Sequence, residues 1–244
     1  MIFIGYSHQD RYKIVESIIF HLKNYGFDVW YDFHDMYLGS NRIKENFEYG
    51  IKSNKYIIFV MSDNIFSSTC AMEELDFARE LYEKNEIVFL PIFYNYKADN
   101  LPRDYEWIKK IIYNEVTDKS GTIYVINQII ERILNDFVFE LQFKNFESIC
   151  HVFENSNNYL YSVINAYTRI DLDNYNTRLG ILYSIYLYIK SLSYDSNYPS
   201  FCEKVITRLH TFTRLNISID HLSFNIFQLT ALIVLNDLID NLNN

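Results

Sequence analysis

The chain has 244 residues, enough for one large domain or two small ones, and 49% of these residues are hydrophobic. A formal net charge of −9, without any run of five or more basic residues, argues against direct binding to nucleic acid or to an anionic membrane. Three widely separated cysteines and six scattered histidines predict neither a disulfide framework nor a metal site, and they fit a cytoplasmic protein.

The apolar segments of the chain indicate buried core rather than a leader peptide or a membrane span. The first apolar run is interrupted by Asp10 and Arg11, too early for a secretory signal. The most apolar later segments, 179–189 and 226–235, are too short to cross a bilayer. We interpret both as core helices.

The first 137 residues alternate between continuous apolar runs and amphipathic segments. We predict strands at 2–6, 28–31, 55–61 and 86–93, with a weak edge strand at 111–116. We predict helices at 10–25, 41–53, 70–85 and 121–137, and an irregular or partly helical segment at 94–110. Apolar strands that alternate with helices are typical of an α/β, flavodoxin-like doubly wound parallel sheet.

From residue 138 the alternation stops and only helical patterns remain. The predicted helices cover 139–154, 159–169, 177–193, 200–215 and 219–242. The sequence therefore predicts two domains, an α/β domain at 1–137 and an all-α C-terminal domain at 138–244.

Three loops are expected at one edge of the predicted sheet. They begin at Ser7, Asp32 and Ser62, each directly after a predicted strand. In open parallel sheets the ligand crevice lies outside the carboxyl ends of the strands. We therefore expect a ligand at this edge.

The residues around these loops resemble the conserved segments of TIR domains. The matching segments are Phe3–Asp10, then Trp30–Asp32 with Leu38, Gly39 and Ile43, then Ser62, Asn64 and Ser68 followed by Glu74, Leu75 and Ala78. They keep the family's order and approximate spacing over about the first 135 residues, with Cys70 where many members carry Trp. The resemblance is to bacterial TIR proteins that cleave NAD, such as the TIR component of Thoeris-type anti-phage defence.

The resemblance implies that Glu74, rather than Glu73, is the catalytic carboxylate, because Glu74-Leu75-x-x-Ala78 fits the family pattern. Loss of nicotinamide leaves positive charge on the ribose, and a nearby carboxylate can stabilise that charge. Nicotinamide is already a cationic leaving group, so no general acid is required. Without the resemblance, a solvated acid near a helix N-terminus would be the simpler interpretation.

Further residues are candidates for substrate binding. They are Tyr6, Ser7, Asp32, Phe33, Tyr37, Gly39, Arg42, Ser68 and Cys70. Phe33 or Tyr37 could stack on a base or on nicotinamide. Gly39 could adopt a positive φ or permit close packing. Cys70 is a helix-start or pocket-wall residue rather than a nucleophile.

The sequence thus predicts an NAD nucleosidase or ADP-ribosyl cyclase with NAD as substrate and without a cofactor. The expected partners are further copies of the chain through TIR–TIR contacts, and a phage-derived trigger or a protein at the helical domain. Two alternatives remain: an interaction scaffold without catalysis, and a nucleoside-transferring enzyme of a related sheet fold.

Overall fold

The structure is a computed structural model that describes residues 2–31, 38, 39, 41, 43–192, 194–215 and 217–243. It divides into two compact units, residues 1–126 and residues 127–244. Helix α4 (Ile123–Glu140) begins in the first unit and continues in the second, and the expected boundary after residue 137 falls within this helix.

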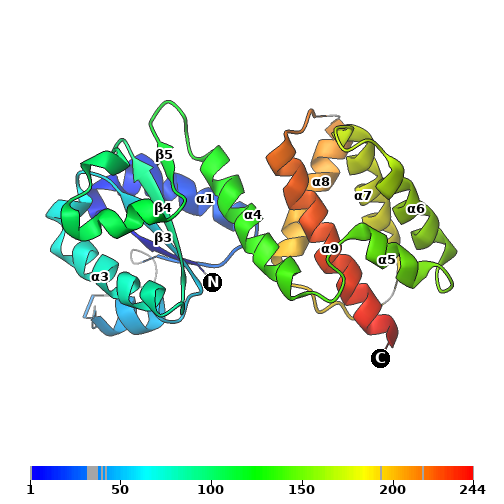
Figure 1. The fold of residues 1–244 in the computed structure, drawn as a ribbon, viewed down its shortest axis with the longest axis horizontal. Helices are drawn as coiled ribbons and strands as arrows, with labels where there is room; N and C mark the ends of the chain where they lie inside the picture. Colours follow the sequence, from blue (N-terminus) through cyan, green and yellow to red (C-terminus); the bar gives the residue numbers. More distant parts are fainter. Residues whose placement is uncertain are drawn as a thin grey trace. The chain divides into compact units, whose positions relative to one another are not determined.

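The first unit is built on a five-stranded parallel sheet (Figure 1). The strands are β1 (Ile2–Gly5), β2 (Val29–Trp30), β3 (Tyr56–Met61), β4 (Val88–Tyr94) and β5 (Asn114–Val116). They are ordered β2-β1-β3-β4-β5, and every neighbouring pair is parallel. The predicted doubly wound α/β sheet is therefore confirmed, with all five strands near their expected positions.

Helical segments follow the strands and cover both faces of the sheet. They are η1 (His8–Asp10), η2 (Arg11–Val15), α1 (Glu16–Asn24), η3 (Lys44–Ile51), η4 (Ile65–Ser67), α3 (Thr69–Glu83), η5 (Ala98–Asn100) and η6 (Arg103–Lys110). Figure 1 shows α1 and α3 on opposite sides of the sheet. Two predicted α-helices differ in form. The predicted helix 10–25 begins with a 3₁₀ turn and a π-helical turn before α1, and the predicted helix 41–53 is the π-helix η3.

The face of the sheet beneath η3 and α3 carries an aromatic core. Phe3, Trp30 and Phe59 lie in this core together with Leu75 of α3. The rings of Phe3 and Trp30 are stacked with their centroids 5.1 Å apart. Gly5 leaves room for this packing, because a Cβ at that position would come within 2.4 Å of the Phe59 ring.

The second unit contains the remaining helices of the chain. They are α5 (Phe146–Phe153), α6 (Asn158–Arg169), α7 (Tyr175–Ser191), α8 (Phe201–Leu215) and α9 (His221–Asn243). The helical C-terminal part of the prediction is confirmed, with most helix ends within about two residues of their expected positions.

One predicted helix, 139–154, was wrong at its start. The structure ends α4 at Glu140 and begins α5 at Phe146. The side chain of Asn145 caps α5 by accepting a hydrogen bond from the Ser148 N–H at 2.8 Å. Asn236 of α9 holds the connection by bonding both the N–H and the carbonyl of Phe143. The Asn145 cap and the contact between Phe143 and Asn236, which are 93 residues apart, therefore interrupt the helix that the sequence pattern predicts.

Among the described residues, the segment His221–Leu242 of α9 is the one helix whose length and mean hydropathy of 1.6 would allow it to cross a membrane. Of its most apolar window, 72% is buried inside the structure. This burial is what a core helix requires, in agreement with the sequence interpretation of 226–235.

Candidate active site

Glu74 lies near the start of α3, the helix that follows β3. The side chain of Ser68 caps this helix by accepting a hydrogen bond from the Ala71 N–H at 3.4 Å. Glu74 is only 8% exposed and lies on the face that also buries Ala71 and Leu75, whereas Glu73 is exposed. A helix that follows a parallel strand starts at the carboxyl edge of the sheet, so the buried carboxylate lies where a ligand is expected.

Asn46 of η3 contacts this carboxylate directly. Its Nδ2 donates a hydrogen bond to Oε1 of Glu74 at 2.5 Å, and Asn46 itself is 3% exposed. Sequence reasoning missed Asn46, although one signal was available. With Gly50, four residues later, it marks the inward face of a helical segment, and a polar side chain on such a face needs a partner.

Tyr6 and Ser7 follow the end of β1 and are both buried. The Tyr6 hydroxyl accepts a hydrogen bond from Nε of Arg11 at 3.3 Å, and its ring lies 5.7 Å from the ring of Tyr31. The Ser7 hydroxyl has no hydrogen-bond partner among the residues that the structure describes. The two predicted substrate-binding residues of this loop therefore lie at the same edge as Glu74.

Asp10 joins the loop after β1 to the loop after β3. It is fully buried and accepts hydrogen bonds from Oγ of Ser62 at 2.5 Å and from Nδ2 of Asn64 at 2.6 Å. The Ser62 hydroxyl in turn accepts from the Asn64 N–H at 3.2 Å. All three residues belong to the segments that resemble TIR domains, but no role was predicted for them. In the structure their hydrogen bonds hold the two loops together.

The other candidates near these loops have differing environments. Ser68 is partly buried and caps α3, and Cys70, in the first turn of α3, has an exposed free thiol. Gly39 has a φ of +95° with open space around it, the left-handed conformation that was expected there. Four candidates lie outside the described residues: Asp32, Phe33, Tyr37 and Arg42.

A comparison with protein families matches residues 2–120 to the model described as TIR domain. Residues 2–120 form a TIR domain. All the segments that resemble TIR domains, from Phe3 to Ala78, lie within this matched range.

The TIR domain is homologous to archaeal and bacterial proteins. It is 28% identical over 133 residues to a probable 2′ cyclic ADP-D-ribose synthase, TcpO, of Methanobrevibacter olleyae, which covers 54% of this chain and 38% of the relative. It is 29% identical over 133 residues, 53% of this chain and 38% of the relative, to the NAD(+) hydrolase TcpA of a Theionarchaea archaeon. It is 27% identical over 138 residues to the 2′ cyclic ADP-D-ribose synthase BtTIR of Bacteroides thetaiotaomicron, and this alignment covers 54% of this chain and 44% of the relative. The chain thus spans less than half the length of these curated relatives.

Two solved structures also align with the TIR domain. The TIR domain of the Toll-related receptor TRR-2 from Hydra magnipapillata aligns with a TM-score of 0.39 and 20% identity, over 47% of this chain and 82% of that one. The TIR domains of the activated Roq1 resistosome align with a TM-score of 0.45 and 21% identity, over 54% of this chain and 98% of that one.

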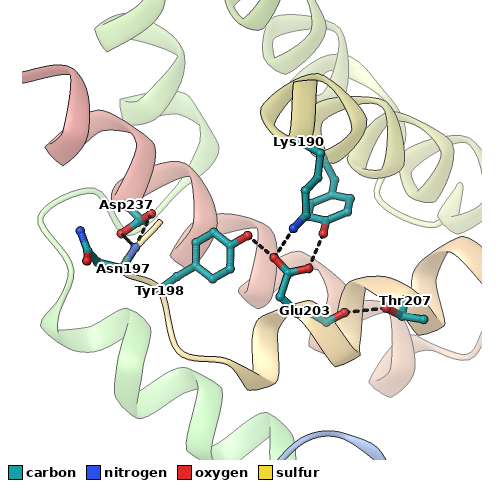
Figure 2. Close-up of polar contacts among 7 residues, drawn as sticks. Lys190, Asn197, Tyr198, Glu203, Thr207 and Asp237 are labelled. Atoms are coloured by element: carbon teal, nitrogen blue, oxygen red, sulfur yellow. Dashed lines mark hydrogen bonds and ion pairs between the residues drawn. The ribbon is translucent and has the colours of Figure 1, made fainter. Parts of the chain in front are cut away.

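Outside the TIR domain, the helical unit contains a polar cluster around Glu203 of α8 (Figure 2). The carboxylate accepts hydrogen bonds from Nζ of Lys190 at 2.5 Å, from the Tyr186 hydroxyl at 2.8 Å and from the Tyr198 hydroxyl. Burial alone would raise the pKa of Glu203, but the hydrogen bonds from Lys190, Tyr198 and Tyr186 outweigh it and hold that pKa below its ordinary value. Every oxygen of this carboxylate has a partner, so we interpret the cluster as structural.

This cluster predicts an acid sensitivity of the helical unit. Because the folded pKa of Glu203 is depressed, its stabilising effect is fully present above about pH 5 and is lost as the pH falls through the folded pKa. We expect Glu203→Gln to flatten the dependence of stability on pH below about pH 5. Urea unfolding followed by far-UV circular dichroism at several pH values measures this, with exposed Glu140→Gln as the matched control. Identical pH profiles for the wild type and Glu203→Gln would contradict the assignment.

Proposed function

We propose that the TIR domain cleaves the bond between nicotinamide and ribose in NAD, with Glu74 as the catalytic carboxylate. The observation that carries the proposal is a single one: a buried carboxylate at the carboxyl edge of a parallel sheet, held by an amide donor. The names of the relatives, NAD hydrolases and cyclic ADP-ribose synthases, support the same chemistry.

The reaction needs only one such carboxylate. Nicotinamide in NAD carries a positive charge, so it leaves as a neutral molecule without protonation. The bonding electrons depart with it, and positive charge develops at C1′ and the ring oxygen of the ribose. A carboxylate fixed near that ribose stabilises the charge as it forms, which lowers the barrier. Water, or a nucleophile within the ADP-ribose itself, then captures C1′, giving free ADP-ribose or a cyclised isomer.

The TIR domain would act on NAD as a substrate, with no separate cofactor, and would associate with further copies of itself. The ADP-ribose product would serve as a signal in anti-phage defence, with the helical unit responding to a phage-derived trigger or a protein partner. This role rests on the resemblance to Thoeris-type TIR proteins.

A specific feature favours the second candidate, a TIR scaffold without catalysis. Cys70 is exposed at the position where many family members carry an aromatic wall residue. A scaffold would bind other TIR domains through the same surfaces and leave NAD unchanged.

The two functions are separated by incubating the full chain with NAD over a series of protein concentrations. If the site is shared between neighbouring copies, as the resemblance to TIR enzymes implies, we expect nicotinamide release to rise more steeply than in proportion to protein concentration. Chromatography quantifies nicotinamide, and mass spectrometry identifies the ADP-ribose product. Absence of nicotinamide at every concentration, with self-association demonstrated by light scattering, would favour the scaffold.

A further inference from the structure

We infer that Asn46 is a positioning residue that holds the Glu74 carboxylate in its reactive orientation. This inference rests on the proposed function and adds to it a residue from a different helix. The contact joins η3 to α3 across 28 residues of sequence, through Nδ2 of Asn46 and Oε1 of Glu74.

The position of Asn46 is fixed by packing on either side of it. Phe47 contacts Phe77 of α3, with ring centroids 5.0 Å apart. Gly50 lies so close to the Phe3 ring that an added Cβ would come within 2.9 Å of it. These contacts place η3 firmly between β1 and α3, so the amide of Asn46 has little freedom and the carboxylate that it bonds is oriented in advance.

An amide is a suitable partner for a carboxylate that must face a developing cation. A lysine or arginine at this position would also bind Oε1, but its positive charge would oppose charge development on the ribose. The amide of Asn46 is neutral, so its hydrogen bond brings no positive charge of its own to Oε1. An asparagine at position 46 therefore suits catalysis better than a lysine or arginine there would.

The amide of Asn46 is only half satisfied by hydrogen bonds. Its Oδ1 is buried and has no hydrogen-bond partner among the described residues. An unsatisfied buried carbonyl oxygen is unfavourable for folding by about 1–3 kcal/mol. Asn54 has the same unsatisfied oxygen, so what distinguishes Asn46 is its bond to Glu74.

The test uses two variants of Asn46 in the full chain and measures nicotinamide release as kcat, KM and pH profile. Asn46→Ala removes the donor, and we expect kcat to fall about 10-fold or more while KM changes less than about 3-fold. Asn46→Asp is nearly isosteric and places a second carboxyl group against Glu74. The two groups then share a proton, and we expect the acidic limb of the kcat profile to move upward by roughly one pH unit or more.

Asn54 provides a matched control. It is 2% exposed, its Nδ2 donates to the Gly50 carbonyl, and its Oδ1 also lacks a partner among the described residues. Asn54→Ala should therefore cost comparable stability, as measured by thermal unfolding, and should leave the pH profile of kcat unchanged.

The outcomes separate this inference from the proposed function. If Glu74→Gln abolishes release and folded Asn46→Asp keeps the wild-type pH profile and kcat, Asn46 does not position the carboxylate. The same conclusion follows if Asn46→Ala and Asn54→Ala lower kcat equally. If Glu74→Gln retains full activity, the proposed function itself fails.

Discussion

Replacing Glu74 with glutamine is expected to slow nicotinamide release by at least about 10²–10³-fold, the effect of removing one electrostatic contact to a developing charge. Glutamine keeps the shape of the side chain, and its carbonyl oxygen can still accept the bond from Asn46. The substitution therefore removes the negative charge and little else. Steady-state kinetics on the full chain measures the loss, and we expect it mainly in kcat because the charge acts in the transition state.

The adjacent residue offers the control for this experiment. Glu73 undergoes the same chemical change in Glu73→Gln, one position away on the same helix, but its side chain is exposed. We expect that variant to release nicotinamide at the wild-type rate. Equal activity of both variants, or a larger loss in Glu73→Gln, would remove Glu74 from the mechanism.

Asp10→Ala is the second change with a large expected effect. It deprives Ser62 and Asn64 of a buried acceptor, and hydrogen bonds to a charged group contribute about 1.5–3 kcal/mol each. We expect the free energy of unfolding of the TIR domain to fall by about 2–4 kcal/mol. Activity should fall as well, because the loop that begins at Ser62 leads directly into α3.

The two tryptophans make this loss measurable within the full chain. Trp30 and Trp107 both lie in the first unit, so tryptophan fluorescence during urea unfolding reports on that unit alone. Exposed Asp63, in the same loop, gives the control variant Asp63→Ala. If both variants unfold at the same urea concentration, Asp10 does not stabilise the domain by holding the two loops together.

The sheet could be predicted from sequence because its signals are local. The run 55–61 is nearly all apolar, and it forms β3 with all of its residues from Tyr56 to Met61 buried. Glu74 could be chosen over Glu73 because Glu74-Leu75-x-x-Ala78 fits the family pattern, whereas local periodicity alone would favour a solvated acid. The break before α5 could not be predicted, since it depends on Asn236 in a helix far along the chain.

The contacts that build the candidate site could not be predicted for the same reason. Asn46 reaches Glu74 across 28 residues, and Asp10 reaches Ser62 across 52. Neither pairing leaves a trace in local periodicity, because each depends on how two loops or helices meet at the sheet edge.

Arg178 of α7 is a buried charged residue in the helical unit that the sequence did not predict. It is 7% exposed, its guanidinium lies 4.4 Å from the ring centroid of Tyr167 and 5.1 Å from that of Phe224, and it donates to Gln228. The helix pattern gave no reason to expect a charged side chain in this core. Aromatic faces and an amide acceptor from other helices make its burial tolerable.

A crystal structure with a non-cleavable NAD analogue tests most directly whether the nicotinamide ribose lies against Glu74. We expect the ribose hydroxyls within hydrogen-bond distance of the Glu74 carboxylate, with the base beside the loops after β1 and β3. An analogue bound elsewhere on the chain, with Glu74 still enclosed and untouched, would contradict this placement.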